Sequence, residues 1–449
     1  MYQTLFHIPN RVGPIPFLTW NEDWGFGLVW LVLVLSGGLV LFSKVRRGGW
    51  SRDFVQSLLT LIGVAAAYVV IVPKIVDDQG LPVQGYGMML LLAVVLGVWL
   101  AVYRARQMGV DPEIIYTITF WVFIGGIIGA RGFYVAEYYD HFLRYDSQGQ
   151  LLLKDTILAM VNITKGGLVV YGSFLGASVA FGILAWRNRL PVLPLSDYLV
   201  ASLVLGQGIG RIGCLLNGCC FGGVCEQPNL PQITFPFGSP PHVRQVETGL
   251  TFVHGIKLDA DQNGSVFIAE VEPGSPAAAA GLAAGQTVVT INDILVANNI
   301  GQAIQVLLAI NKPGEEISVR TRGELRPYTW RAADPLERSL PVHPTQIYSA
   351  INGLVFFFFA WTYFPFRRRD GQVFATLLTL FPITRFLMEI IRIDEPHAFW
   401  LGMTISQLIS VLLIAASVPF WYWVLRQPKD RMMTPADWQP YNKRWARRG

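Results

Sequence analysis

Long apolar runs, separated by polar segments rich in Gly and Pro, dominate the chain. Runs of about 20 apolar residues predict transmembrane helices, because a helix of that length crosses the hydrocarbon layer. We expect such helices at 26–42, 54–73, 87–103, 114–136, 167–186, 194–216, 345–364, 372–392 and 401–425. The pattern therefore predicts an all-α polytopic membrane protein, in which two N-terminal helices precede a seven-helix core.

One long segment does not follow this pattern. Residues 226–342 lack any apolar run of membrane-spanning length and are rich in Gly, Pro and charge, and they are long enough for a small domain. Strands are expected at 266–271, 287–291 and 315–321, an Ala-rich helix after Pro276, and a further helix at 301–310. We therefore expect a small α/β insert.

Composition agrees with a membrane protein. Charged residues make up 14% of the 449 residues and hydrophobic residues 52%, whereas soluble proteins carry about 25% charged residues. This excludes a soluble enzyme and a disordered chain. The expected domains are extra helices at 1–80, a first core part at 81–225, the insert at 226–340, a second core part at 341–426 and a basic tail at 427–449.

The basic residues predict the orientation. Arg104 and Arg106, Arg367 to Arg369 and the tail after 425 fall in segments that lie inside if the N-terminus lies outside. Short inner loops of membrane proteins carry an excess of Lys and Arg. We therefore expect the N-terminus and the insert outside and the C-terminus in the cytoplasm. Because the basic residues occupy such loops, nucleic acid is not an expected partner.

Charged residues inside the spans are the main candidates for function. Arg131, Arg211, Arg385 and Arg392 lie near the outer ends of expected helices, and Glu389 shares a helix face with Arg385 and Arg392. Such residues are costly in a membrane and usually mark a site. Two explanations are open: the arginines pair with acids or reach lipid headgroups, or together they bind an anionic lipid phosphate.

Four cysteines fall within one short window. They are Cys214, Cys219, Cys220 and Cys225. This clustering excludes a disulfide framework spread over a secreted domain. A local disulfide, a zinc site and a catalytic thiol all remain compatible with the window.

Seven motifs occur in an order that resembles the phosphatidylglycerol–prolipoprotein diacylglyceryl transferases of bacteria. They lie at 85–87, 125–131, 166–172, 206–222, 343–348, 384–392 and 404–410. The resemblance implies transfer of a diacylglyceryl group from phosphatidylglycerol to the cysteine thiol of a prolipoprotein signal peptide. A thioether forms and glycerol phosphate leaves, in the bacterial inner membrane. The resemblance implies neither a metal nor a cofactor.

The same resemblance implies roles for particular residues. Catalytic roles fall to Tyr86, Tyr171, His343, Arg385 and Glu389, with Glu389 orienting Arg385. By this resemblance, binding of phosphatidylglycerol falls to Arg211, Asn217 and Gly222, and the argument from charges within the spans adds Arg131 and Arg392. Some family members have a histidine, thought to be the base, at the position of Tyr171. A phenol with a pKa of about 10 is a poor base at neutral pH, so His343 is the second candidate.

The insert resembles a PDZ domain of the bacterial protease-associated kind. The resemblance rests on residues 266–296, and Gly249 to Phe252 would be the loop that binds a peptide carboxylate. Such a domain would bind peptide C-termini or unfolded clients. An inert spacer with a PDZ-like fold explains the same residues.

Two other classes of function fit the sequence less well. A transporter or channel with an outer PDZ-like sensor domain would need polar residues at mid-membrane in two matched halves, whereas the charges here lie near one leaflet. A zinc protease would need an H-E-x-x-H motif, which is missing from the sequence.

Overall fold

The computed structural model describes residues 4–8, 35, 37–38, 61–62, 81–146, 150–162, 167, 169–324, 326–393, 402–430 and 432–446. They form two compact units, one within 1–91 and 210–346 and the other within 92–209 and 347–449. The expected helices at 26–42 and 54–73 lie almost wholly outside the described residues.

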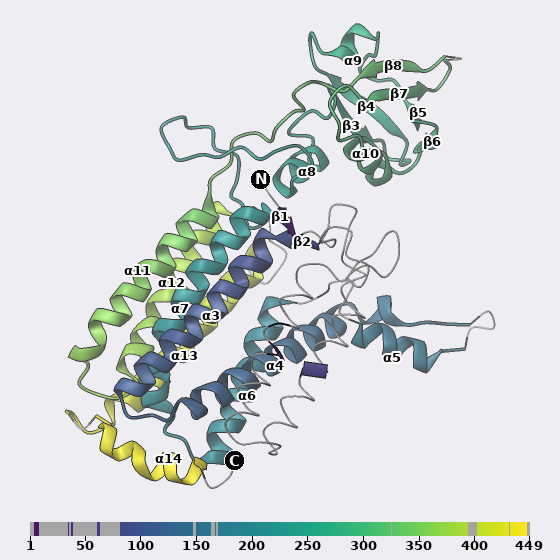
Figure 1. The fold of residues 1–449 in the computed structure, drawn as a ribbon. Helices are drawn as coiled ribbons and strands as arrows, with labels where there is room; N and C mark the ends of the chain where they lie inside the picture. The colour runs from purple at the N-terminus through teal and green to yellow at the C-terminus, as the bar shows by residue number, and fades with distance from the viewer. Residues whose placement is uncertain are drawn as a thin grey trace. The chain divides into compact units, whose positions relative to one another are not determined.

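Seven helices in the described part are long and apolar enough to cross a membrane, which confirms the expected core. They are α3 (Gly85–Gln107), α4 (Pro112–Glu137), α6 (Val170–Asn188), α7 (Val192–Asn217), α11 (Thr345–Tyr363), α12 (Gln372–Ile391) and α13 (Ile405–Leu425) (Figure 1). Large apolar side chains on them are exposed, such as Trp99 at 63% and Ile128 at 66%. Exposed apolar surface of this extent suits contact with lipid.

Helices α4 and α6 pack side by side through glycines (Figure 1). A Cβ atom on Gly125 would lie 2.8 Å from the carbonyl oxygen of Gly176, and one on Gly129 would overlap the carbonyl of Gly172. Each helix thus carries two glycines four residues apart, the spacing that lets membrane helices approach closely. Ser173 Oγ adds a hydrogen bond to the carbonyl of Gly126 at 3.0 Å.

An acidic side chain fixes the start of α12. Asp197 on α7 accepts hydrogen bonds from the backbone N–H groups of Gly371 at 2.8 Å and Phe374 at 2.9 Å. These groups have no partner within the helix, and a carboxylate there also interacts favourably with the helix dipole. Arg367 balances the buried charge, with its Nε 3.6 Å from Asp197. Asp197 thereby joins α7 to α12.

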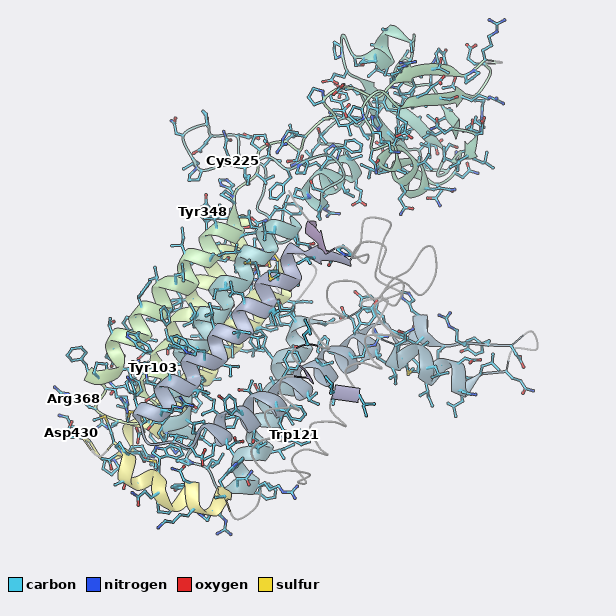
Figure 2. All side chains as sticks on the ribbon, in the orientation of Figure 1. Tyr103, Trp121, Cys225, Tyr348, Arg368 and Asp430 are labelled. Carbon is cyan, nitrogen blue, oxygen red and sulfur yellow. The ribbon has the colours of Figure 1, made fainter. Side chains whose placement is uncertain are left out.

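The chain after α13 returns to the loop between α11 and α12. The N–H of Asp430 donates to the carbonyl of Arg368 at 2.9 Å (Figure 2). Trp438, which precedes α14 (Gln439–Ala446), is fully buried in the core of this unit and donates to the hydroxyl of Tyr198 at 3.4 Å. The tail is therefore part of the packed unit.

The insert forms short strands and helices around its own core. Its elements are α8 (Pro240–Glu247), β3 (Ile256–Ala260), β4 (Val266–Val271), α9 (Pro276–Ala279), β5 (Val288–Ile291), β6 (Ile294–Leu295), α10 (Ile300–Ala309), β7 (Glu316–Thr321) and β8 (Tyr328–Arg331). One sheet pairs β3 with β4, and the other has the order β6-β5-β7-β8 (Figure 1). The expected α/β insert is confirmed. The sequence patterns did not predict helix α8 or strands β3, β6 and β8.

Candidate functional site

Ion pairs connect the charged side chains on one face of α12. Glu389 is fully buried, and its Oε2 lies 2.6 Å from Nη1 of Arg385 and 3.6 Å from Nη1 of Arg392. The contact expected between Arg385 and Glu389 is therefore present. A buried carboxylate is stable only when it is paired. Two guanidinium groups and one carboxylate leave a net charge of +1 on this face.

A serine on α13 joins this face to α6. Ser406 Oγ accepts a hydrogen bond from Arg385 Nη2 at 2.8 Å and is also hydrogen-bonded to the hydroxyl of Tyr171. Ser406 lies in the first turn of α13, which begins with a capping box formed by Thr404 and Gln407. Tyr171, in the first turn of α6, is thus brought to Arg385. The sequence motif contained Ser406, but local spacing did not single it out.

Arg131 holds the backbone between α5 (Leu153–Val161) and α6. Its guanidinium donates to four carbonyl oxygens, those of Ala159, Met160, Asn162 and Gly167, at 2.7–3.0 Å. The first carbonyls belong to the end of α5, where such groups lack helical partners. The geometry gives Arg131 a role in holding the start of α6. Its binding of lipid stays a prediction.

The other compact unit contains the end of α7. Arg211 lies there, within electrostatic range of the Tyr86 phenol on α3. A Cβ atom on Gly213 would lie 3.2 Å from the Tyr86 ring, so this glycine lets the two helices approach. Asn217 forms a side-chain hydrogen bond with Cys219. Tyr86, Arg211 and Asn217 are thus neighbours.

Gly222 and His343 also meet in this unit. The N–H of Gly222 donates to the carbonyl of His343 at 3.1 Å, and the N–H of His343 donates to the carbonyl of Gly223 at 3.0 Å. A Cβ atom on Gly222 would lie only 2.7 Å from the Cβ of His343. Gly222 therefore permits a close backbone pairing beside a half-buried histidine.

Three arginines lie at one position relative to the helix ends. Arg131, Arg211 and Arg385 each lie six residues before the last residue of their helix. At a rise of about 1.5 Å per residue, each is about 9 Å from that end. Arg131, Tyr171, Arg385, Glu389 and Arg392 belong to one unit and Tyr86, Arg211, Asn217, Gly222 and His343 to the other.

The loop of the insert expected to bind a carboxylate has its donors engaged. The N–H groups of Leu250 and Thr251 donate to the carbonyl of Gln245 at 2.8 and 3.3 Å, and that of Gly249 donates to the carbonyl of Val246 at 3.0 Å. Both carbonyls belong to the end of α8. In this conformation α8 therefore occupies the donors that a peptide carboxylate would need.

Most of the chain is similar to known proteins of one family. Residues 73–423 match the prolipoprotein diacylglyceryl transferase family. A phosphatidylglycerol–prolipoprotein diacylglyceryl transferase of Rhodopirellula baltica is 31% identical, over 93% of this chain and 88% of the relative. Proteins with that description from Thermosynechococcus vestitus and Synechococcus elongatus are 32% and 34% identical, over 38% and 35% of this chain and 59% and 50% of their own lengths.

Proposed function

The chain belongs to the prolipoprotein diacylglyceryl transferase family, and we propose that the cluster of Arg385, Glu389, Arg392, Ser406 and Tyr171 is part of its catalytic site. The protein is a multi-pass bacterial membrane transferase of lipoprotein biosynthesis. It transfers the diacylglyceryl group of phosphatidylglycerol to the cysteine thiol of a prolipoprotein, which yields a thioether and glycerol phosphate. One observation carries the proposed site: two guanidinium groups share the buried carboxylate of Glu389.

The charge of this cluster suits the leaving group. The thiolate forms a bond to the terminal glycerol carbon of the diacylglyceryl group while the bond from that carbon to the phosphate oxygen breaks. Negative charge develops on the departing phosphate, and guanidinium groups held in place stabilise it. The net charge of +1 on the α12 face matches the single negative charge of a phosphodiester. Arg211 is proposed to bind the phospholipid as well.

The hydroxyl groups supply polar contacts for the reacting atoms. Ser406 is hydrogen-bonded to both Tyr171 and Arg385, so these hydroxyls can orient the incoming thiol against the phosphate ester. A thiol has a pKa of about 8.5, and the positive field of the arginines favours its thiolate. The proton goes to the departing phosphate or to His343, the second candidate for the base.

We propose an orientation with the insert outside and the C-terminus in the cytoplasm of the inner membrane. Arg104 and Arg106 end α3 and Arg187 ends α6, and these are ends that this orientation places inside. The positive-inside rule supports that assignment. Labelling of a cysteine introduced at the exposed Asn298 with a membrane-impermeant thiol reagent in intact spheroplasts tests it. Protection of that position until lysis would reverse the orientation.

The PDZ-like insert is proposed to affect the choice of clients. Because α8 occupies the loop donors, a peptide C-terminus can bind only when the end of α8 moves. The side chain of Gln245 holds that end by bonding the backbone of Leu340. Peptide titration of the full chain should therefore show tighter binding by Gln245→Ala than by the parent chain. No saturable binding by either protein supports a spacer.

The site is tested with phosphatidylglycerol and a peptide containing the prolipoprotein cysteine. We expect Arg385→Ala and Arg211→Ala to abolish transfer, and a variant lacking 230–338 to retain it. Arg244→Ala is the matched control and should be fully active, because Arg244 is an exposed arginine of α8 in the insert that pairs with Glu247. Wild-type rates for Arg385→Ala would refute the proposed site.

A further inference from the structure

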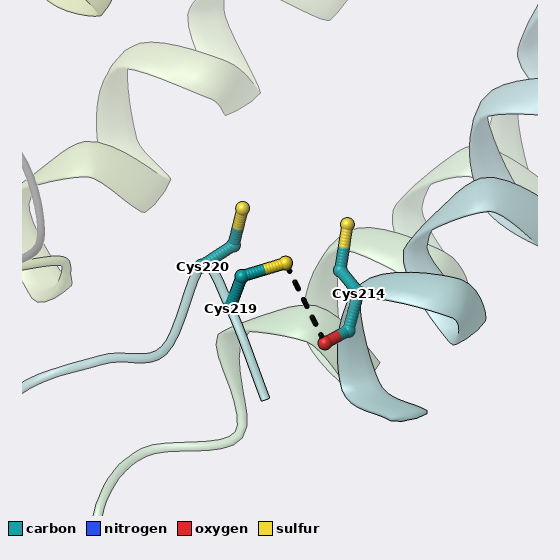
Figure 3. Close-up of side chains that lie close together, drawn as sticks. All are labelled: Cys214, Cys219 and Cys220. Carbon is teal, nitrogen blue, oxygen red and sulfur yellow. Dashed lines mark hydrogen bonds between the residues drawn. The ribbon is translucent and has the colours of Figure 1, made fainter. Parts of the chain in front are cut away.

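Three thiols converge where α7 ends. Cys214 lies in the last turn of α7, and Cys219 and Cys220 follow in the next loop (Figure 3). The three sulfur atoms all lie within 4.8 Å of one another. Each cysteine is partly exposed, so an ion can reach the group. Cys225 is buried, and its thiol donates to the carbonyl of Gln227 at 3.5 Å.

The backbone is bent to bring the thiols together. Gly218 has a φ of 77° and Cys220 a φ of 59°. A positive φ is uncommon for a residue with a side chain, so it persists only where the surroundings enforce it. The N–H of Cys219 also donates to the carbonyl of Cys214 at 3.1 Å, which closes the turn.

Two buried side chains from α11 enforce this bend. Thr345 Oγ1 donates to the carbonyl of Cys220 at 2.6 Å, and Gln346 Nε2 donates to the carbonyl of Cys219 at 2.8 Å. Both side chains belong to residues that are 1% exposed. The position of the thiols is therefore fixed by bonds that do not involve sulfur, as expected of a preorganised ligand set.

The spacing fits one metal ion. With a zinc–sulfur distance of about 2.3 Å, two thiolates on a tetrahedral ion lie about 3.8 Å apart. Sulfur atoms within 4.8 Å reach that spacing by small side-chain rotations. A disulfide would use only two of the three sulfurs. Zn²⁺ with three thiolates has a net charge of −1. Arg211 lies three residues before Cys214 on the same face of α7, so its positive charge helps to balance the site.

We propose that Cys214, Cys219 and Cys220 bind one thiophilic d¹⁰ cation, Zn²⁺ or Cu⁺, as thiolates. Binding releases the three thiol protons and leaves room for a fourth ligand from solvent or a bound molecule. The ion would cross-link the end of α7 to the loop that α11 holds. The proposal concerns this cluster alone and does not depend on the assignment of the catalytic residues.

Metal titration of the full chain in detergent tests the site. Reduced, chelator-treated protein is titrated without oxygen with Co²⁺, then Zn²⁺, and separately with Cu⁺ against a competing chelator. We expect one equivalent of metal to bind. If the site takes Zn²⁺, bound Co²⁺ should give sulfur-to-cobalt charge-transfer absorption, which added Zn²⁺ removes. If the site takes Cu⁺, the protein should retain only Cu⁺ against the chelator. Cys225→Ser, the matched control, should bind equally. Cys214→Ser, Cys219→Ser and Cys220→Ser should each bind at least about 100-fold more weakly.

A second measurement uses the parent chain and therefore does not depend on the folding of the serine variants. Alkylation of the parent chain, followed by mass spectrometry, should show that the preferred ion protects the three cysteines together and that a chelator removes the protection. Failure of both ions to bind or to protect, or unchanged affinity in a folded serine variant, would overturn the proposal. So would a disulfide that re-forms after reduction and prevents metal uptake.

Discussion

Ser406 on α13 accepts a hydrogen bond from Arg385 on α12 at 2.8 Å. The same hydroxyl is bonded to Tyr171, so three helices meet at one oxygen atom. Tyr171, at the start of α6, is thus held by a neighbouring helix. This bond helps to position Tyr171 beside Arg385.

Removal of the Ser406 hydroxyl should reduce turnover without unfolding the protein. Ser406→Ala removes a bond to a charged group, and such bonds contribute about 1.5–3 kcal/mol, so we expect kcat to fall by about 10- to 100-fold. The measurement is the rate of diacylglyceryl transfer at saturating phosphatidylglycerol. Ser417→Ala is the control, since Ser417 is also buried on α13 and its hydroxyl donates to the carbonyl of Ile414 in the same helix. Equal rates for both variants would refute a role for Ser406 in positioning.

Loss of the Glu389 charge should affect stability and activity together. Glu389→Gln leaves Arg385 and Arg392 without the carboxylate they share, and breaking a buried ion pair costs about 3–5 kcal/mol. We expect a lower midpoint of thermal unfolding and no transfer activity. Glu389→Asp keeps the charge and should recover part of both. An active Glu389→Gln variant with an unchanged midpoint would contradict the assigned role.

The sequence predicted features that depend on neighbours along the chain. The shared face of Arg385, Glu389 and Arg392 follows from helical periodicity alone, and the ion pairs are found on it. Contacts between distant segments could not be predicted in this way. Ser406 is 235 residues from Tyr171, and its hydroxyl has no distinguishing local pattern.

Sequence patterns could not predict helix α5 or the contacts of Arg131. Helix α5 has only nine residues, too short for a clear periodic signal. Arg131 was expected to bind phospholipid because it is an intramembrane cation, and its guanidinium donates to four backbone carbonyls. A cation near a membrane surface can bind either a lipid phosphate or backbone carbonyl groups. The sequence alone does not show which carbonyl groups the fold brings to Arg131.

The glycine contact between α4 and α6 predicts that replacing glycine by alanine on α6 has different effects at two positions. Gly176→Ala places a methyl group against the backbone of Gly125 and Gly129, and such overpacking costs about 1–3 kcal/mol. Gly182→Ala, on the same helix, meets nothing within 4 Å, and should be neutral or stabilising by up to about 1 kcal/mol through helix propensity. Thermal unfolding in detergent measures both. Equal midpoints would mean that the close approach does not stabilise the pair.

Acid should destabilise the insert through His242. Burial lowers the pKa of this histidine to about 4, below its ordinary value of about 6.5. Its Nδ1 accepts a hydrogen bond from the N–H of Gly238 at 3.4 Å, which requires the neutral ring. The Phe237 ring lies tilted against both His242 and His254. The neighbouring His254 also lowers the pKa of His242, because two positive charges repel each other.

The sign of the effect follows from proton uptake. Between pH 6.5 and about 4 the unfolded chain binds the proton and the folded insert does not, so the free energy of unfolding falls as the pH falls through this window. The full loss is on the order of 2–3 kcal/mol below about pH 4. Hydrogen exchange of the insert amides in the full chain at pH 7 and pH 4.5 measures it. His242→Asn keeps an acceptor for Gly238 but cannot titrate, so its pH dependence should be weaker, and an equal dependence would assign the effect to other groups.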